Sequence, residues 1–356
     1  MKKVRYAMIG FGGIAENRIA KEGFACDSTR FKPLRQAVLV GATDINAGRR
    51  AAAEALGLKW YKDAAAVCAD PEIDAVFVAT NNLTHAALAQ QALEAGKAVI
   101  VDKPLAPNSK DARMLVKLAA KKKLSLSVDH MMTHNVLNQQ ARKLIAGGKL
   151  GKVNDACFHM QFAYGFDPAE AASWRCSNHA EMGGPIGDVA SHCFYMAEFL
   201  LDSRIQALRA VYYPKRMAIK VEDGAMIQCD LENGVTFSVL VSFCDARGGL
   251  GGTLSGLGYE IYGDKAVLRG YGTMFQLSGH AGEPLKMRLE LDTFNKQKKF
   301  EVTKPANIYQ GVIIEHAVSV RKGVPLTAVD GLRNVLMCEA AHASAQRGGR
   351  TVKIKN

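Results

Sequence analysis

Several features are absent from this 356-residue sequence, and each absence excludes a class of protein. No apolar run reaches the roughly 20 residues that a membrane-spanning helix needs. The basic and apolar start, MKKVRYAMIGFGG, ends in a glycine-rich turn and lacks a small-residue cleavage site, so we interpret it as a first strand and expect a cytoplasmic protein. The eight cysteines are scattered without a C-x-x-C pair, which favours reduced thiols.

Aromatic residues are also scarce, at 7% of the chain, and they do not alternate with basic residues along any segment. The formal net charge is +12, but the basic residues are dispersed apart from short clusters such as Lys121–Lys123. A nucleic-acid surface needs basic side chains gathered on one face. We therefore expect no nucleic-acid partner and no membrane partner, and charge alone does not indicate an acidic or phosphorylated substrate.

The length of the chain favours two domains, and the first third has the pattern of a parallel sheet. Continuous apolar runs at 4–10, 37–44, 74–80, 98–104 and 124–128 alternate with helical patterns at 14–22, 46–56, 84–95 and 108–122. Runs without polar alternation are typical of strands covered on both faces. The sequence therefore predicts an α/β fold whose residues 1–128 form a doubly wound domain around a parallel sheet.

The pattern changes after residue 128, where longer segments alternate apolar and polar residues. Such alternation, as in GVTFSVLVSF, indicates antiparallel strands with one less buried face. Residues 129–356 are therefore expected to form a second α/β domain with a mainly antiparallel sheet. We expect a glycine-dense loop at 247–258, helices at 309–322 and 330–346, and strands at 153–163, 205–213, 224–231, 235–244, 258–263, 266–270, 273–277 and 286–292.

The segment IGFGGIA joins the first strand to the first helix and has the pattern G-x-G-x-x-G/A. Gly10 permits a tight turn, Gly12 lets the backbone approach a pyrophosphate, and Ala15 allows close packing of helix and strand. The free N–H groups and the dipole of the helix N-terminus favour the phosphates. The sequence therefore predicts dinucleotide binding by this turn, although glycines of this spacing also occur in turns that bind nothing.

Asp44 ends the second strand, where an acidic residue binds the ribose hydroxyls of adenosine and repels a 2′-phosphate. It lies more than the usual ~20 residues beyond the turn, because residues 24–36 lengthen the first crossover. We predict NAD as the cofactor. NADP is not excluded, because Arg49 and Arg50 are nearby, and Asp44 could alternatively only cap the next helix.

Ligands of doubly wound sheets bind at the carboxyl ends of the strands, and two such ends carry polar residues here. ATNNLTH follows the strand at 74–80, and VIVDKPLAP follows the strand at 98–104. Proline stiffens the second turn and would present Lys103 toward a ligand, where a charged amine can stabilise a developing alkoxide. Lys103 is therefore a candidate catalytic residue, although most lysines only face solvent.

The order of these motifs resembles the Gfo/Idh/MocA oxidoreductases over nearly the whole chain. TNNLTH stands where the family commonly has T-P-N-x-x-H, and DKPLA stands where it has E-K-P-x-[AS]. Trp174 and Arg175, followed by GGPIGDVASH, correspond to W-R and G-G-G-x-x-x-D-x-x-x-H, and YEIYGDKAVLRGY to a stretch of the second domain. The departures are Asn81 for Pro, Asp102 for Glu, Pro185 for the third Gly, and a missing Arg-Pro after the sixth strand.

The resemblance implies that residues 1–128 form a dinucleotide-binding Rossmann domain. It also implies that residues 129–356 form an α/β domain that binds substrate and whose large, open, mainly antiparallel sheet mediates homodimers or homotetramers. It places Lys103 near the nicotinamide and the substrate hydroxyl, and it implies that Asp188 and His192 complete the catalytic group with the histidine as proton acceptor. The residues expected at the cofactor are Gly10, Phe11, Gly12, Gly13, Ile14, Ala15, Asp44, Thr80, Asn82, His85, Asp102 and Lys103. Those expected at the substrate are Lys103, His130, Trp174, Arg175, Asp188 and His192.

Asp188 and His192 stand four residues apart, so on a helix their side chains share a face. A carboxylate beside an imidazole orients it and raises its affinity for a proton, as a general base for alcohol oxidation requires. A metal site at this pair, or at the equally spaced His130 and His134, is a weaker interpretation because no further ligands gather nearby. We therefore expect no metal.

The sequence thus predicts an NAD(P)-dependent oxidoreductase that transfers a hydride between the nicotinamide and a hydroxyl-bearing carbon of a sugar, polyol or cyclitol. Two alternatives stay open at this point. One is a non-catalytic Rossmann sensor or regulator, and the other is an enzyme that retains NAD as a recycled oxidant for glycoside cleavage.

Overall fold

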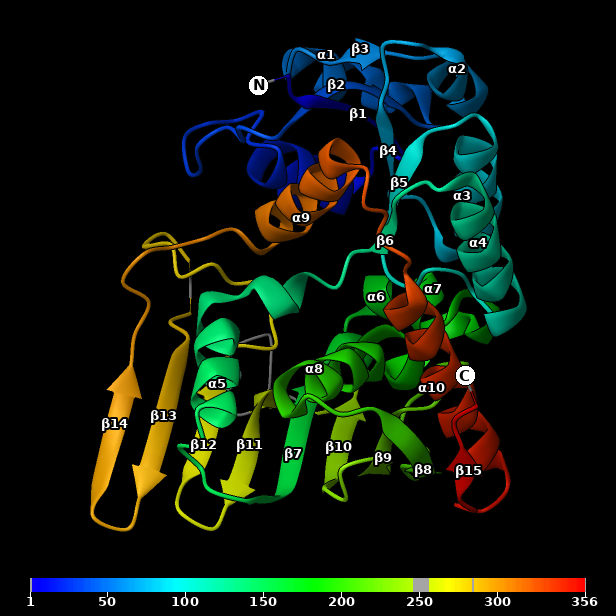
Figure 1. The fold of residues 1–356 in the computed structure, drawn as a ribbon. Helices are drawn as coiled ribbons and strands as arrows, with labels where there is room; N and C mark the ends of the chain where they lie inside the picture. Colours follow the sequence, from blue (N-terminus) through cyan, green and yellow to red (C-terminus); the bar gives the residue numbers. More distant parts are fainter. Residues whose placement is uncertain (1, 246–255, 284, 356) are drawn as a thin grey trace. The chain divides into compact units, whose positions relative to one another are not determined.

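The computed structural model describes residues 2–245, 256–283 and 285–355. They form two compact units (Figure 1), one of Met1–Met131 with Asn307–Val335 and the other of Met132–Ala306 with Leu336–Asn356. The division therefore differs from a single cut after residue 128, because residues 307–335 pack with the first unit. Most of the glycine-dense segment at 247–258 lies outside the described residues.

The first unit contains a six-stranded parallel sheet, with the order β3-β2-β1-β4-β5-β6. Every residue of β4 and β5 is buried, as expected of parallel strands covered on both faces. The doubly wound sheet that the sequence predicts is confirmed. Its strands are β1 (Val4–Ile9), β2 (Ala37–Thr43), β3 (Lys59–Trp60), β4 (Ala75–Val78), β5 (Ala98–Val101) and β6 (Leu126–Val128).

Helices cover both faces of this sheet. Figure 1 shows α9 (Ile308–Lys322) on one side of the strands and α3 (His85–Glu94) with α4 (Ser109–Lys122) on the other. α9 packs on the sheet through His316, whose Nδ1 lies 2.7 Å from the Tyr6 hydroxyl of β1. The further helical elements of this unit are η1 (Ala15–Gly23, π-helical), η2 (Ala47–Arg49), α1 (Arg50–Ala55), α2 (Ala64–Ala69) and η3 (Asn82–Thr84).

The described part of the second unit contains a nine-stranded sheet, in the order β14-β13-β12-β11-β7-β10-β9-β8-β15. Its strand pairs are antiparallel except for β7 and β10, which run parallel. The large, mainly antiparallel sheet is therefore confirmed. Its strands are β7 (Val153–Gln161), β8 (Ile205–Tyr212), β9 (Gly224–Leu231), β10 (Thr236–Ser242), β11 (Leu257–Gly263), β12 (Val267–Tyr271), β13 (Arg288–Thr293), β14 (Lys296–Phe300) and β15 (Val352–Lys353).

One predicted strand of this sheet is wrong. Residues 273–277 form turns and bends after β12, and Gly272 adopts a left-handed φ of 70° where the chain leaves the strand. Thr273 and Met274 are fully buried in this irregular segment. The apolar residues of this segment are therefore buried because the turn packs on the core, and not because they belong to a strand.

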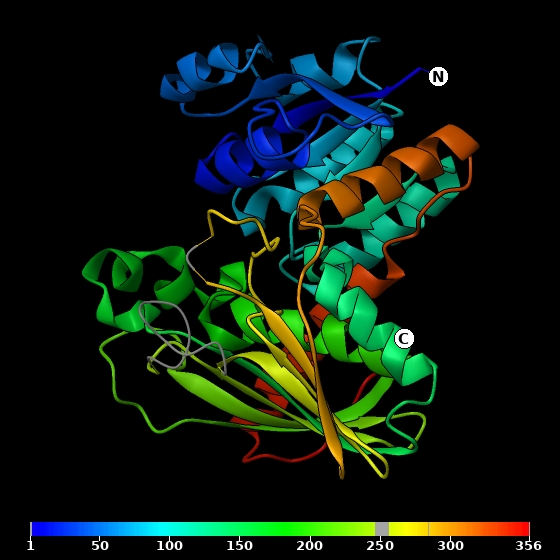
Figure 2. The ribbon, with the colours of Figure 1, turned by 90° about the vertical axis from the view of Figure 1, so that its left-hand side faces the viewer.

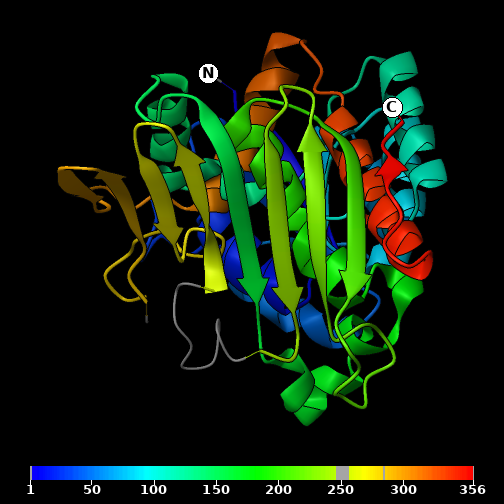
Figure 3. The same ribbon diagram turned by 90° about the horizontal axis from the view of Figure 1, so that it is seen from below.

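Helices lie on one face of the second sheet and leave the other open, as the view in Figure 3 shows. α5 (Val136–Ala146) and α8 (Ser191–Leu201) pack against each other, and α8 also contacts β7. α10 (Val329–Gln346) contributes to both units of the chain (Figure 2). The remaining helical elements are η4 (Met131–His134), η5 (Tyr164–Phe166), α6 (Pro168–Ala172), α7 (Trp174–Ser177), η6 (His179–Glu181) and η7 (Ile186–Ala190, π-helical).

Candidate active site

The turn after β1 has the geometry that its glycines predict. Gly10 has φ of +90°, and a Cβ there would lie 2.6 Å from the carbonyl oxygen of Ala79 at the end of β4. A Cβ at Gly12 or Gly13 would meet no described atom within 4 Å. Gly10 therefore lets the two strand ends approach each other, whereas Gly12 and Gly13 leave the backbone open on the side where a pyrophosphate could approach.

The residues beside these glycines differ in exposure. Phe11 and Ala15 are buried, and Ala15 begins the π-helical η1. Ile14, by contrast, keeps 41% of its surface exposed at the start of η1. An exposed aliphatic side chain beside an open, N–H-rich backbone suits a ligand with both phosphates and an apolar ring.

Asp44 lies at this turn in spite of the lengthened crossover. Its carboxylate accepts hydrogen bonds from the backbone N–H of Phe11, at 2.6 Å, and of Asn46, at 2.8 Å. The sequence left open whether Asp44 only caps the following helix. Its bond to Phe11 places an acidic group at the end of β2 directly beside the glycine turn.

Both arginines that could favour a 2′-phosphate are engaged with acidic residues. Arg49 donates from Nε to the Phe11 carbonyl oxygen, at 2.7 Å, and its guanidinium pairs with Glu16. Arg50 pairs with Glu54 at 2.8 Å. Recruiting either arginine for a phosphate would therefore require an existing ion pair to break.

Buried His85 links the two polar strand ends of the first unit. Its Nδ1 lies 2.8 Å from the Pro104 carbonyl oxygen, and its Nε2 lies 3.2 Å from that of Thr80. Burial lowers the pKa of His85, so the neutral ring donates one N–H, and the shorter contact favours donation to Pro104. His85 therefore connects the segment after β4, including buried Asn82, to the segment that carries Lys103.

The segment after β5 presents Lys103 at the carboxyl end of the sheet. The Lys103–Pro104 peptide bond is cis, and the backbone N–H of Lys103 donates to Asp102 Oδ1 at 2.8 Å. Asp102 thus orients its own turn, a role that its short side chain can fill. The structure brings Asp102, Lys103, Thr80 and His85 together at neighbouring strand ends, as the sequence predicts for a site of this type.

Asp129 is a residue of this group that the sequence analysis did not select. It follows β6 and is fully buried, and neither of its carboxyl oxygens has a hydrogen-bond partner in the part of the chain that the structure describes. Burial raises its pKa well above the ordinary range, the charge of Asp102 adds to the effect, and Lys103 opposes it. Asp129 therefore stays protonated beside two charged groups, an arrangement that is common where protons are handled.

His130 follows Asp129 and is also buried, at 7% exposure. Its Nδ1 lies 2.9 Å from Asp330 Oδ2 at the start of α10. This contact holds the chain after β6 against the part of α10 that belongs to the first unit. A substrate contact at His130 stays a prediction.

In the second unit, Asp188 and His192 lie on consecutive helical elements and are both buried, at 5% and 4% exposure. Asp188 belongs to the π-helical η7, and Arg175 Nε lies 3.4 Å from its Oδ2. His192 belongs to α8, and its Nδ1 lies 2.8 Å from the Tyr195 hydroxyl. The contacts of Asp188 and His192 thus add Arg175 and Tyr195 to the predicted pair.

Aromatic residues accompany this pair. Arg175 stacks over Trp174, with the guanidinium carbon 4.8 Å from the ring centroid, so these two predicted substrate residues act as one unit. Tyr164, which the sequence analysis did not select, stacks on Phe162 with ring centroids 4.9 Å apart. Burial and the charge of Asp188 raise the pKa of Tyr164 to about 12, so its hydroxyl keeps its proton at neutral pH.

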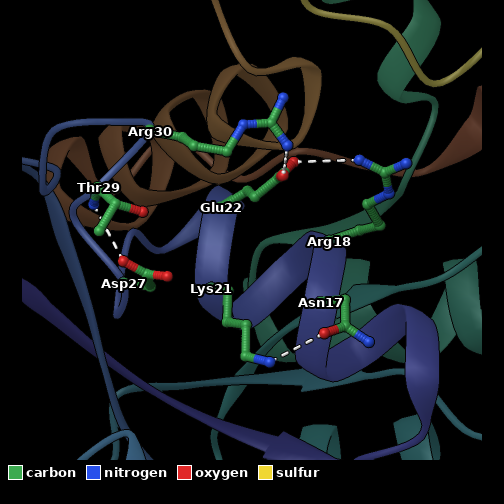
Figure 4. Close-up of a pocket in the computed structure, with 7 residues that line it drawn as sticks. All are labelled: Asn17, Arg18, Lys21, Glu22, Asp27, Thr29 and Arg30. Atoms are coloured by element: carbon green, nitrogen blue, oxygen red, sulfur yellow. Dashed lines mark hydrogen bonds and ion pairs between the residues drawn. The ribbon is translucent and has the colours of Figure 1, made fainter. Parts of the chain in front are cut away.

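A surface hollow in the first unit offers less chemistry. Figure 4 shows it between η1 and the lengthened crossover, lined by Asn17, Arg18, Lys21, Glu22, Asp27, Thr29 and Arg30. Arg18 and Arg30 both pair with Glu22, while Lys21 donates to Asn17 at 2.9 Å. These cations already have partners within the hollow, so we do not assign it to a ligand.

Comparison with known proteins adds a second line of evidence. A family model described as "Oxidoreductase family, NAD-binding Rossmann fold" matches residues 4–130, and a "GFO/IDH/MocA C-terminal domain" matches residues 138–269. Within the described residues, no helix is long and apolar enough to cross a membrane.

Among named relatives, a 1,5-anhydro-D-fructose reductase of Ensifer adhaerens is 29% identical over 58% of this chain and 60% of its own length. A D-apiose dehydrogenase of Paraburkholderia graminis is 26% identical over 100% of this chain and 91% of its own. A solved structure of levoglucosan dehydrogenase with NADH and levoglucosan covers 100% of both chains with a TM-score of 0.83 and 21% identity, which shows a shared fold.

Proposed function

Because this chain belongs to the Gfo/Idh/MocA oxidoreductases, we propose that it transfers a hydride between a nicotinamide and a hydroxyl-bearing carbon of a sugar, polyol or cyclitol. Its first domain is an NAD-binding Rossmann domain. The relatives described above are named for sugars or sugar derivatives, which supports a substrate of this class. The specific sugar and the oxidised carbon are matters for experiment.

The observation that carries this proposal is the position of the glycine turn in the sheet. In the order β3-β2-β1-β4-β5-β6, the strand order reverses between β1 and β4, and ligands of such sheets bind where it reverses. Gly10 follows β1 and touches Ala79 after β4, so the open backbone at Gly12 stands at this position. The residues therefore fit the pyrophosphate of a dinucleotide, and the exposed Ile14 fits an adjoining ring.

Bound NAD would supply the hydride acceptor, and the protein supplies orientation and charge. We assign to Lys103 the stabilisation of the substrate oxygen, because a charged amine at a strand end favours a developing alkoxide. Asp102 holds the backbone of that turn. Protonated Asp129 keeps a second negative charge away from Lys103 and can donate a hydrogen bond to a neighbouring oxygen.

We assign the proton transfer to His192, with Asp188 as its electrostatic partner. Oxidation of an alcohol releases the hydroxyl proton as the hydride leaves the carbon, so a positioned base is required. The hydroxyl of Tyr195 lies 2.8 Å from Nδ1 of His192 and helps to orient the imidazole ring. The guanidinium of Arg175 pairs with Asp188 and partly offsets its negative charge. Trp174, beneath Arg175, supplies an apolar surface on which a sugar ring can stack.

The decisive experiment is a screen for NADH and NADPH formation across sugars, polyols, sugar acids and sugar phosphates, followed by variants with the best substrate. Lys103→Met should lower kcat/KM by about 10²–10³-fold and His192→Ala by about 10²–10⁴-fold. Lys110→Met, which changes an exposed lysine on α4, is the matched control and should retain wild-type activity. Wild-type turnover in both active-site variants would refute the assigned roles.

The cofactor preference has its own test. We propose that NAD is preferred, because Asp44 lies beside the turn and both nearby arginines are paired. Asp44→Ser should weaken NAD binding and reduce the ratio of the affinity for NAD to the affinity for NADP. The substitution removes an acceptor for the ribose hydroxyls and a negative charge that repels the 2′-phosphate. A wild-type protein that prefers NADP would show that Arg49 or Arg50 outweighs Asp44.

We also propose that two or four copies associate through the open face of the second sheet in the cytoplasm. Val211 of β8 and Met226 of β9 pair across this sheet and keep about half of their surfaces exposed, at 49% and 50%. Exposed apolar pairs on a sheet favour association. Val211→Lys combined with Met226→Lys should produce monomers in light scattering, whereas a monomeric wild type would contradict the proposal.

A further inference from the structure

Three residues that the proposed reaction does not use come together in the second unit. His179 belongs to η6, Glu222 lies two residues before the start of β9, and His342 lies on α10. One ligand atom from each lies within 4.8 Å of the others, and His179 Nδ1 is 3.6 Å from Glu222 Oε2. These are two imidazoles and one carboxylate, a donor set that zinc uses where three protein ligands leave a fourth position open.

Glu222 has an oxygen whose hydrogen bonding is unsatisfied. Its side chain is 2% exposed, and Oε1 accepts a hydrogen bond from the backbone N–H of Ile186 at 2.9 Å. Buried Oε2 has no hydrogen-bond partner among the described residues. Burial raises the pKa of Glu222 to about 7. An unpartnered buried carboxylate oxygen is costly, and a cation that binds it would remove that cost.

The backbone beside Glu222 is adapted to this carboxylate. Gly184 has φ of +91°, and a Cβ on it would lie 2.5 Å from both carboxylate oxygens. Only glycine therefore permits the close approach of this segment to Glu222. The approach positions one oxygen toward the N–H of Ile186 and leaves the other toward His179.

His342 has the environment of a metal-binding histidine. Its Nδ1 lies 2.9 Å from the Tyr212 hydroxyl of β8, so Nε2 is the nitrogen available to an ion. A second polar partner that fixes the other ring nitrogen is the usual support of a metal-ligating histidine. Burial lowers the pKa of His342 to about 4, which keeps the ring neutral and able to bind a cation at neutral pH.

Lys215 carries a positive charge that acts on Glu222, but its amine is already bonded to two other groups. Lys215 donates from Nζ to the Val221 carbonyl oxygen, at 2.5 Å, and to Asp223 Oδ1, at 2.6 Å. Asp223 therefore offsets the charge of Lys215. Half of the His179 side chain is exposed, so this ring can shift toward the other two ligands and an ion can enter from solvent.

From this geometry we propose that His179, Glu222 and His342 bind a single zinc ion, with water or another small ligand in the fourth position. Zinc bonds of roughly 2.0–2.2 Å would bring the ligand atoms to about 3.3–3.6 Å from one another, which requires a modest contraction of the group. The ion would tie η6, the start of β9 and α10 together. This proposal does not depend on hydride transfer, which needs no metal.

The test uses full-length protein without a histidine tag, treated with EDTA and dialysed, and titrated calorimetrically with Zn²⁺ at neutral pH. We expect one saturable site with micromolar or tighter affinity. Half of the His179 side chain is exposed, so His179→Ala should fold normally. This variant should weaken zinc binding at least about tenfold.

Two further variants sharpen the result. Tyr212→Phe should weaken binding by about 10–100-fold, because Tyr212 supports His342 without touching the ion. His159→Asn is the matched control: His159 Nε2 also lies 3.6 Å from a glutamate, Glu260, but no third ligand joins this pair among the described residues. That variant should bind zinc like the wild type.

Spectroscopy separates this site from adventitious binding. Co²⁺ in the same protein should give the visible absorption of a tetrahedral site, and His179→Ala should abolish it. Absence of saturable zinc binding, or zinc and cobalt binding that His179→Ala leaves unchanged, would overturn the proposal. Loss of oxidoreductase activity is not part of this readout, so failure of the zinc proposal and failure of the proposed function are distinguishable.

Discussion

Substitution of three glycines by alanine separates the structural and ligand-binding roles of the turn after β1. Gly10→Ala places a Cβ at φ +90° and within 2.6–2.7 Å of Ala79 and Thr80. A strained φ costs about 1–3 kcal/mol, and forced overpacking costs a further 1–3 kcal/mol or so. We expect Gly10→Ala to lose roughly 2–6 kcal/mol of the free energy of unfolding.

Two other glycines serve as controls for the separate contributions. Gly57 has φ of +75° and open space around its Cβ position, so Gly57→Ala tests backbone strain without a clash. Its cost should be only about 1 kcal/mol, because the smaller entropy of the unfolded chain offsets part of the strain. Gly12 has neither a positive φ nor a neighbour within 4 Å, so Gly12→Ala should change stability by less than about 0.5 kcal/mol.

Cofactor affinity should follow a different order from stability. The Cβ of Gly12→Ala projects where we propose that the pyrophosphate rests, so its Kd for NADH should rise at least about tenfold, or 1.4 kcal/mol. Urea unfolding measures stability, and NADH fluorescence measures binding. If Gly12→Ala binds NADH as tightly as the wild type, the pyrophosphate does not rest on this turn. If Gly10→Ala is no less stable than Gly57→Ala, the clash with Ala79 is refuted.

Three further predictions concern buried groups. Burial raises the pKa of Asp129, so its contribution to stability is full below about pH 4 and declines as the pH rises. Asp129→Asn should therefore gain stability relative to the wild type above about pH 4. A difference in unfolding free energy between the two proteins that stays constant with pH in urea titrations would contradict this. Burial lowers the pKa of His316 to about 4, so its contribution to stability is full above about pH 6.5 and is lost toward pH 4. His316→Gln should therefore flatten the acid side of the plot of unfolding free energy against pH. Parallel plots for the variant and the wild type would refute the lowered pKa. Phe158→Ala, at a fully buried ring, should cost about 3–5 kcal/mol in urea unfolding, whereas Phe294→Ala, at a 95% exposed ring, should cost less than about 0.5 kcal/mol.

The sequence predicted those parts of the molecule that depend on local chain geometry. Gly10 and Gly12 belong to one short turn, and the strands around them are continuous apolar runs, so their arrangement could be read without knowing any distant contact. The position of Lys103 was predicted for the same reason, because the end of a buried strand and a following proline are both local features, and its catalytic role stays a prediction. The large second sheet followed from the alternation of apolar and polar residues.

Features that depend on packing between distant segments were not predicted. Asp129 is important because β5 and β6 pair in a register that places it beside Asp102, and one carboxylate after a strand gives no sign of this. His179 and His342 are far apart in the chain, so their approach to Glu222 has no counterpart in sequence spacing.

The edge of the second sheet shows another limit. β14 contains KQKKF at Lys296–Phe300, and this charged, exposed segment has no apolar alternation to identify it as a strand. Lysines at a sheet edge discourage further strand pairing, so the physical requirement of an edge strand removes the pattern used to find strands. Conversely, buried Met274 contributed to a strand prediction at residues that form a turn.

The discontinuous composition of the first unit determines how this chain can be dissected. Since α9 returns to the parallel sheet after the whole of residues 132–306, a fragment ended near residue 128 would lack a helix that covers β1 and would expose Tyr6 and its neighbours to water. A nucleotide-binding fragment would instead require residues 2–131 to be joined to 307–335 by a short artificial connection. The chain thus passes from the first unit to the second and back before it ends in Leu336–Asn356 of the second unit, so no single cut separates the two.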